Sequence, residues 1–229
     1  MQKDTLKTLL VAQEERRALV LITPLSGGRE EIVAEDSLDK KHPHAKELSN
    51  CFHHGSSATV QGESGEFFLQ AFLPAPRLII IGATHIAQVL VRLARELGVE
   101  SFIIDPRTAF ATEERFNGVN IITQWPGEAL SELKLDTRSA LVCLAHVPDI
   151  DDEALCAALS SDCVYIGALG SRRSHAKRVE RLKAKGFGEE QLNRIHGPVG
   201  LDIGAVSPNE IALSIIAELV KTLRSQAGD

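Results

Sequence analysis

The sequence predicts an α/β protein: a Rossmann-like parallel sheet with helices on both faces, preceded by a small α+β N-terminal domain. Three observations predict this fold class. After Pro76, short apolar runs alternate with stretches of helical periodicity, which is the pattern of a parallel sheet. The first of these runs passes through a glycine turn at Gly82 directly into a helix. The prolines of segment 74–76 cannot continue a strand ladder, so they mark a boundary with the first third of the chain.

Residues 1–74 are predicted to form the small α+β domain. The first segment is amphipathic, and the last two apolar runs flank a Gly-Glu-Ser-Gly turn. The predicted elements are a helix over 1–18, a strand over 18–23, a helix near 43–52 within the polar segment 27–55, and strands over 57–61 and 66–73 joined by a turn over 62–65.

Residues 75–229 are predicted to form the Rossmann-like domain, which would bind a nucleotide or a cofactor. The run 78–81 is apolar throughout, as expected for a strand that is buried on both faces of a sheet. Further strands are predicted over 101–104, 119–123, 140–144 and 163–166, and helices over 86–97, 111–116, 126–133, 151–160 and 172–185.

A last helix begins at Pro208. Ser207 supplies an N-cap and Glu210 the acid of a capping box. The body of this helix is apolar nearly all round, which predicts burial against the sheet or against another copy of the chain. We expect the chain to form a homodimer.

Composition limits the classes of ligand. The chain has 229 residues, a formal net charge of −6 and 4% aromatic residues, which argues against nucleic-acid binding. No stretch approaches the roughly 18 apolar residues needed to span a bilayer, and the polar start does not resemble a signal peptide. We therefore expect a cytoplasmic protein that binds neither nucleic acid nor membranes. The histidines at 42, 44, 53 and 54 lack the spacing of metal ligands, so no metal site is predicted.

The turn after the first strand is a modified dinucleotide-binding turn. Gly82 allows a tight turn, and Ala87 is small enough for close packing of the helix on the strand. Asp105 follows Gly82 by 23 residues, where an acid would accept a hydrogen bond from a ribose hydroxyl. The pattern favours binding of a nucleotide or another phosphate at the helix N-terminus. Thr84 replaces the middle glycine, so a turn that keeps the fold without the ligand is the alternative.

Other polar residues follow the fourth and fifth strands. His146 comes at the end of the fourth strand and should face the Gly82 turn, where it would bind a ligand, transfer a proton or cap the neighbouring Asp149 turn. Gly170 lies in a second glycine turn, followed by Arg172 and Arg173, which could clamp a phosphate.

The helix over 172–185 carries seven basic residues and one acid in an otherwise acidic chain. Its lower part could dock an acidic partner, or it could be a solvated face. The glycine-dense loop 194–205 contains His196 and Asp202 as candidate polar contacts, with a purely structural loop as the alternative.

Five stretches together resemble the XdhC/CoxI family of xanthine dehydrogenase accessory proteins. They are Phe72-Leu-Pro-Ala-Pro-Arg-Leu78, Gly82-Ala-Thr-His85, Asp105-Pro-Arg107, Tyr165-Ile-Gly-Ala-Leu-Gly-Ser-Arg-Arg-Ser-His-Ala-Lys-Arg178 and Ile195-His-Gly-Pro-Val-Gly-Leu-Asp-Ile-Gly-Ala205. The last two are long and specific, and the resemblance covers roughly residues 66–224.

The resemblance implies a chaperone that binds molybdenum cofactor (molybdopterin), supports its sulfuration with a cysteine desulfurase, and inserts it into an apo molybdenum hydroxylase. Such a maturation factor need not be an enzyme, and no catalytic residue is assigned. The alternative is an NAD(P)-dependent oxidoreductase that uses the same turn and Asp105, with His146 as an acid. A third reading is a scaffold whose basic helix docks a partner.

The chain departs from the family pattern in two places. The family turn usually reads Gly-Ala-Gly-His, whereas Thr84 stands at the second glycine here. The glycine- and cysteine-containing motifs of the family's N-terminal domain are absent from residues 1–70, so no role is carried over to Cys51. The predicted cofactor-binding residues are Gly82, Ala83, Thr84, His85, Asp105, Arg107, His146, Gly170, Ser171, Arg172, Arg173, His196 and Asp202.

Overall fold

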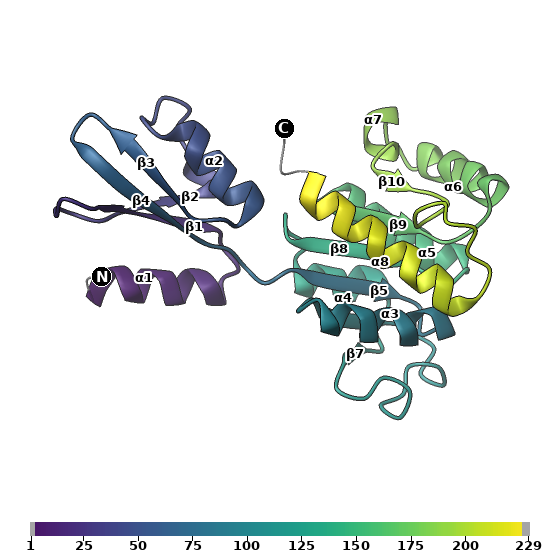
Figure 1. Ribbon diagram of the computed structural model, residues 1–229. Helices are drawn as coiled ribbons and strands as arrows, with labels where there is room; N and C mark the ends of the chain where they lie inside the picture. The colour runs from purple at the N-terminus through teal and green to yellow at the C-terminus, as the bar shows by residue number, and fades with distance from the viewer. Residues whose placement is uncertain (1–2, 226–229) are drawn as a thin grey trace. The chain divides into compact units, whose positions relative to one another are not determined.

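The computed structural model describes residues 3–225 and contains two compact units (Figure 1). The first unit extends to Pro74, and the second is Ala75–Leu223. The fold class predicted from the sequence is confirmed: an antiparallel sheet comes first, and a parallel sheet with helices on both faces follows.

The first unit is a four-stranded antiparallel sheet in the order β2-β1-β4-β3, with one helix on each face. Helix α1 packs Leu9 against one face of β1, and α2 packs Leu48 and Phe52 against the other. The elements are α1 (Lys3–Glu14), β1 (Leu19–Pro24), β2 (Glu31–Ala34), a 3-10 turn (Glu35–Ser37), α2 (Ala45–His54), β3 (Ala58–Gly62) and β4 (Gly65–Phe72).

The sequence-based prediction missed one strand of this unit and misplaced one helix end. Strand β2 lies in the polar segment 27–55, for which only a helix was predicted, and it is held by antiparallel pairing with β1. Only Val33 of this strand is buried, so its local pattern carries little strand signal. Helix α1 ends at Glu14, short of the predicted residue 18, because Arg16 adopts a φ of 55°, which a helix cannot contain.

The second unit is a six-stranded parallel sheet in the order β10-β9-β8-β5-β6-β7. If the strands of this unit are numbered 1 to 6 in chain order, starting with β5, the order read from β7 to β10 is 3-2-1-4-5-6. This is the 3-2-1-4-5 order expected of a Rossmann-like sheet, extended by a sixth strand. The strands are β5 (Arg77–Ile81), β6 (Glu100–Ile104), β7 (Asn120–Ile122), β8 (Ser139–Cys143), β9 (Tyr165–Ala168) and β10 (Ile195–His196).

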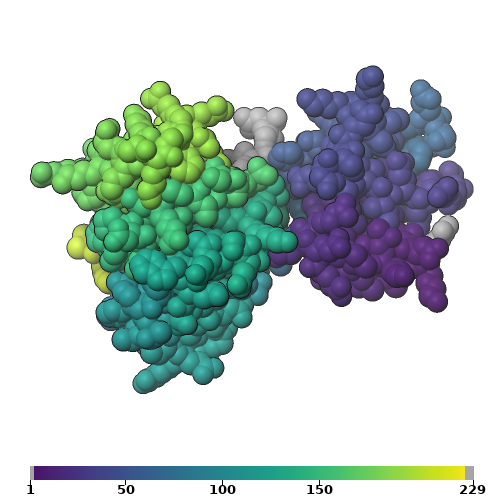
Figure 2. All heavy atoms as spheres, turned by 180° about the vertical axis from the view of Figure 1, so that it is seen from behind, coloured from purple at the N-terminus to yellow at the C-terminus, as the bar shows by residue number. Residues whose placement is uncertain are grey.

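Helices cover both faces of this sheet. Because successive side chains of a strand point to opposite faces, Leu78 and Ile80 of β5 pack toward α3 and α8, whereas Ile79 and Ile81 pack toward α4 and α5. Figure 2, seen from behind, shows the teal and green side chains on the α4 and α5 face. The helices are α3 (His85–Glu96), α4 (Pro126–Leu133), α5 (Pro148–Leu159), α6 (Arg172–Ala184), α7 (Glu189–Leu192) and α8 (Pro208–Ser225).

The last helix is buried against the sheet, which is one of the two environments predicted for it. Ala212, Ile215 and Leu219 of α8 belong to the same core cluster as Leu78. Leu213 and Val220 on the other side of α8 stay exposed. The expected homodimer stays a prediction.

The helix predicted over 111–116 is wrong, because this segment forms a series of turns. Single hydrogen bonds, such as Arg115 N–H to the Thr112 carbonyl at 3.1 Å, replace a continuous helical ladder. Phe116 is buried in the core without a helix. The elements β10 and α7 were not predicted, because two and four residues are too few to show a periodic pattern.

The turns after β5 and β8 touch each other. A Cβ atom added to Gly82 would lie 2.6 Å from both the Cα and the N of Ala145, and Gly82 has a φ of +103°. Glycine is therefore required here by the close approach of two backbones as well as by the turn.

We expect Gly82→Ala to destabilise the protein by about 2–5 kcal/mol, because backbone strain of roughly 1–2 kcal/mol adds to an overpacking cost of about 1–3 kcal/mol. Urea unfolding followed by circular dichroism measures this. Gly186→Ala is the matched control, because Gly186 has a φ of +97° and nothing within 4 Å of an added Cβ. Equal losses in the two variants would show that contact with Ala145 is unimportant.

Candidate functional site

The candidate site lies at the carboxyl edge of the parallel sheet, where the turns after β5, β6, β8, β9 and β10 meet. In open α/β sheets this edge is where ligands bind, at the point where the strand order reverses. Here the reversal falls between β5 and β8, whose following turns are in contact at Gly82 and Ala145. The predicted residues all lie in or next to these turns. They divide among three environments, except for His85, which lines a separate groove along α3.

The first environment is the Gly82 turn. Thr84 caps α3, because its Oγ1 accepts a hydrogen bond of 3.2 Å from the Ala87 N–H. The Ala83 N–H donates to Asp105 Oδ2 at 2.8 Å. Two N–H groups in and after this turn thus already have partners within the chain. The contact of this turn with a phosphate stays a prediction.

His85 lies at the start of α3 and faces a different cavity. It lines a groove of about 520 Å³ that also includes Arg92, Arg115 and Asn209. This groove runs along the exposed side of α3 and is separate from the cavity that follows β8 and β9.

Asp105 is completely buried and accepts four hydrogen bonds. Ala83 N–H and Arg107 Nη2 donate to Oδ2, each at 2.8 Å, while Arg107 N–H and Nε donate to Oδ1 at 3.0 and 2.9 Å. Burial alone would raise the pKa of Asp105, but the hydrogen bonds from Arg107 and Ala83 outweigh it and lower the pKa below its usual value. Both carboxylate oxygens therefore hold the turn and the Arg107 guanidinium in place. The ribose contact of Asp105 stays a prediction.

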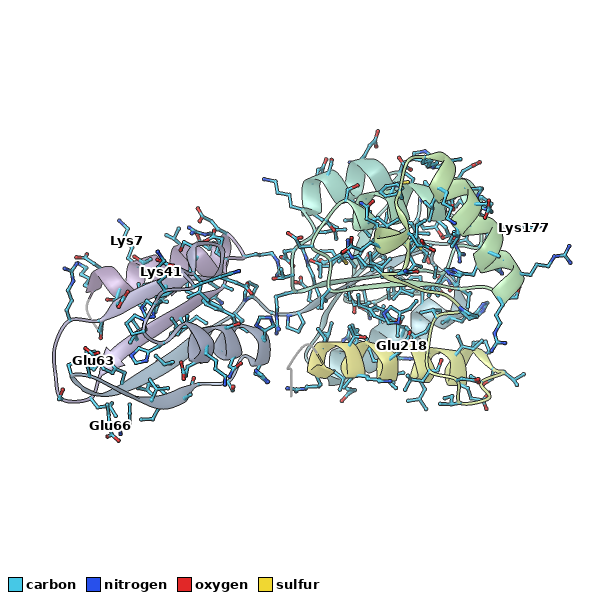
Figure 3. The ribbon with its side chains drawn as sticks, turned by 90° about the horizontal axis from the view of Figure 1, so that it is seen from above. Lys7, Lys41, Glu63, Glu66, Lys177 and Glu218 are labelled. Carbon is cyan, nitrogen blue, oxygen red and sulfur yellow. The ribbon has the colours of Figure 1, made fainter. Side chains whose placement is uncertain are left out.

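The second environment is a cavity of about 270 Å³ between α5 and α6. Its lining residues are His146, Pro148, Asp151, Ser174, Lys177, Arg178 and Arg181. His146 comes from the turn after β8, as predicted, and has a φ of 62°, an uncommon conformation for a residue with a Cβ. Lys177 extends from α6 in Figure 3.

Two buried charges line this cavity, and a third is paired with one of its lining residues. Arg178 and Asp151 are 4% and 3% exposed, and both line it. Burial raises the pKa of Asp151 to about 6, against the opposing effects of Arg178 and of the backbone of Ala145 and His146. Asp152 is 4% exposed and forms a two-pronged ion pair with Arg181, at 2.5 and 2.8 Å.

The sequence-based prediction missed Arg178, Asp151 and Ser174. For Ser174 and Arg178, a signal existed in the helix that follows the second glycine turn. Positions 174, 178 and 181 are spaced by four and three residues, so they share one face of α6. Asp151 is in the first turn of the helix after the fourth strand, where parallel sheets of this kind place ligand contacts.

The predicted arginine pair lies beside this cavity without lining it. Ser171 caps α6, because its Oγ accepts a hydrogen bond of 3.1 Å from the Ser174 N–H. Arg172 and Arg173 follow in the first helical turn and are exposed. Gly170 precedes them with a φ of +141°. The pair is thus available to a ligand that extends out of the cavity, and the proposed phosphate clamp stays a prediction.

The third environment is built around Glu218 of α8, which Figure 3 labels. Its Oε2 accepts hydrogen bonds from the Tyr165 hydroxyl at 2.6 Å and from the Gly200 N–H at 2.8 Å, and its Oε1 lies 3.2 Å from His196 Nδ1. Burial and the neighbouring Glu218 raise the pKa of Tyr165. His196 thus fastens the glycine-dense loop to α8, while Asp202 is exposed in that loop.

The described residues contain no cluster for a metal ion and no helix suited to a membrane. Nowhere between residues 3 and 225 do three or more His, Cys, Asp or Glu side chains gather closely enough to share a metal. None of the helices in that range is long and apolar enough to cross a bilayer.

Comparison with known proteins assigns the chain to a family. The family described as the XdhC Rossmann domain matches residues 78–219, which include β5 through most of α8. The chain belongs to the XdhC family. The resemblance inferred from the sequence motifs is therefore confirmed.

Two curated relatives each match more than two thirds of the chain. It is 34% identical over 166 residues to a Bacillus subtilis protein named as a probable xanthine dehydrogenase component, covering 72% of this chain and 48% of that protein. It is 30% identical over 162 residues to the molybdenum cofactor insertion chaperone PaoD from Escherichia coli, covering 71% of this chain and 45% of PaoD. The chain thus spans about half the length of these two relatives.

A solved structure resembles nearly the whole chain. The crystal structure of a xanthine dehydrogenase from Bacillus halodurans aligns with a TM-score of 0.67 and 25% identity, covering 97% of this chain and 64% of that one. The likeness includes the N-terminal unit as well as the XdhC Rossmann domain.

We expect Asp105→Asn to lower the free energy of unfolding by about 1–3 kcal/mol at pH 7, because a buried carboxylate with charge-assisted hydrogen bonds is lost. Because the pKa of Asp105 is lowered in the folded state, its stabilisation is complete above the unfolded pKa of about 3.9. It declines below that pH and is lost as the pH falls through the lower pKa of the folded state. The difference between variant and wild type should therefore shrink between pH 7 and pH 3. Urea unfolding at both pH values measures it, with Asp202→Asn in the exposed loop as the control. A difference that is independent of pH would contradict the assignment.

Proposed function

We propose that this XdhC-family chain binds molybdenum cofactor and assists its sulfuration and insertion into a xanthine dehydrogenase-type molybdenum hydroxylase. The observation that carries the proposal is the 30% identity, over 71% of this XdhC-family chain, to a protein named as a molybdenum cofactor insertion chaperone. The partners would be an apo molybdenum hydroxylase and a cysteine desulfurase. The role is that of a maturation factor, without turnover of a small substrate.

The residues at the carboxyl edge of the sheet fit such a cofactor. Molybdopterin ends in a phosphate, which calls for paired donors and positive charge. Arg178 has buried Nε and Nη1 atoms without a partner among the described residues, and Lys177 lies beside it. Arg172 and Arg173 could contact a larger ligand that extends out of the cavity. When bound, the cofactor supplies the molybdenum that the hydroxylase needs, and the chain's residues hold and shield it.

An NAD(P)-dependent oxidoreductase is the competing function. It would need Asp105 to accept a hydrogen bond from a ribose hydroxyl. Both oxygens of this carboxylate already accept two hydrogen bonds each. This observation favours the cofactor chaperone, although the strand order suits either function.

We expect anaerobic calorimetric titration of the purified chain to detect binding of molybdenum cofactor and none of NAD or NADP. Adding the cofactor-loaded chain to an apo molybdenum hydroxylase should restore activity faster than free cofactor does. Binding of NAD or NADP together with hydride transfer, or no binding of the cofactor, would contradict the proposal.

The double variant Arg172→Ala/Arg173→Ala tests the arginine pair in the same titration. We expect cofactor affinity to fall about threefold to tenfold, because each exposed charge contributes up to about 1 kcal/mol. The matched control is Lys183→Ala/Lys185→Ala, which removes the same charge from the other end of the helical segment. Unchanged affinity in the first variant would exclude the arginine clamp.

A further inference from the structure

Arg178 is a buried guanidinium that the chain only partly satisfies. Helix α6 places it against the end of β9, where its Nη2 donates a hydrogen bond of 2.8 Å to the Leu169 carbonyl. Its Nε and Nη1 are shielded from solvent and have no partner among the described residues. Buried charged donors are nearly always paired in folded proteins, since an unpaired one costs more than the bond itself contributes. A missing ligand would supply the partner.

The nearby carboxylate of Asp151 does not serve as the missing partner of Arg178. Asp151 lines the same cavity and is 3% exposed, and its Oδ1 also has no partner among residues 3–225. Within those residues no ion pair joins it to Arg178. Asp152, the next residue, is already paired with Arg181. Two buried groups of opposite charge therefore line one cavity with unpaired atoms.

The cavity has the size and charge for a small anion. Its volume of about 270 Å³ falls just below the range of about 300–1,000 Å³ for pockets that enclose a whole ligand, so it suits a head group. Lys177 and Arg178 contribute positive charges that no described ion pair offsets, and the hydroxyl of Ser174 lies in the first turn of α6. The N-terminal turn of a helix adds further positive potential.

We propose that this cavity binds a phosphoryl group. Arg178 and Lys177 hold its oxygens, and Asp151 accepts a hydrogen bond from a hydroxyl that the phosphoryl group or its neighbouring atoms carry. The site lies one helical turn beyond the arginine pair that the sequence suggested. The phosphoryl group belongs either to free phosphate or to the end of a larger ligand. Its assignment to molybdenum cofactor rests on the function proposed above.

Titration with inorganic phosphate tests the site without the cofactor. We expect saturable binding to the wild-type chain, an affinity at least tenfold lower in Arg178→Met, and an affinity about threefold lower in Lys177→Met. Lys177 is exposed, so its variant tests the site without disturbing the core. Lys183→Met, on the same helix outside the cavity, should bind like wild type. No saturable binding to wild type, or equal binding to all three variants and wild type, would overturn the proposal.

Dependence on pH tests the role of Asp151. Burial raises its pKa to about 6, so above that pH its negative charge opposes an anion in the cavity. The charged or titratable groups around it are Lys177, Arg178 and Arg181 of α6, His146 and Cys143 at the end of β8, Arg107 after β6, and Asp152 beside it.

Sulfate is the probe for this experiment, because its charge is constant between pH 5 and pH 8. We expect its affinity for wild type to increase about tenfold as the pH falls across this range, and to change little in Asp151→Asn. His146 lines the same cavity, so His146→Gln is the control, and it should retain most of the dependence. Dependence that persists in Asp151→Asn and disappears in His146→Gln would overturn the role of Asp151.

The same variants distinguish a failure of this phosphoryl site from a failure of the proposed function. If inorganic phosphate binds as expected and molybdenum cofactor does not, the site stands and the cofactor function is wrong. If Arg178→Met and Lys177→Met bind the cofactor as wild type does, the cofactor's phosphate does not occupy this cavity and that assignment is overturned.

Discussion

The close approach of the turns after β5 and β8 is the constraint on which the site depends. These strands are neighbours in a parallel sheet, so their carboxyl ends point the same way and their turns must pass each other. Only a residue without a side chain fits at Gly82, where an added Cβ would lie 2.6 Å from the backbone of Ala145. The contact fixes the Ala145–His146 backbone from which the cavity opens.

Asp105 secures the same turn from the neighbouring strand. It is buried at the end of β6, and its carboxylate links the Ala83 backbone to Arg107. In a dinucleotide-binding protein an acid at this place contacts the ribose. Here the corresponding carboxylate is used to hold the turn, and the unpaired polar atoms lie instead between α5 and α6. The fold is thus Rossmann-like, while the proposed phosphoryl site lies at Arg178 and Lys177 of α6, the helix that follows β9.

Much of this architecture could be predicted from the sequence. The apolar run 78–81 and the spacing of the later runs predicted a parallel sheet, since strands buried on both faces have no polar alternation. Strand β2 could not be predicted, because its pairing with β1 decides its structure. The turns at 111–116 were mistaken for a helix because the burial of Phe116 is a tertiary effect that a local pattern does not record.

The candidate site was predicted less completely than the fold. Glycine turns and their flanking residues are adjacent in sequence, so Gly82, Gly170 and His146 could be identified. Arg178 and Asp151 are 27 residues apart (178 − 151), and only the packing of α6 beside α5 brings them to one cavity. A basic residue in a basic helix carries no local sign that it is buried. The unpaired atoms of these two side chains become visible only in three dimensions.

The central claim is that the carboxyl edge of this sheet holds a phosphorylated ligand through the buried guanidinium of Arg178. A crystal structure of the chain grown anaerobically with molybdenum cofactor tests it most directly. We expect density for a phosphoryl group within hydrogen-bond distance of Arg178 Nε and Nη1. Density for the bound cofactor with its phosphate at the α3 groove, or in contact with Arg172 and Arg173 alone, would contradict it.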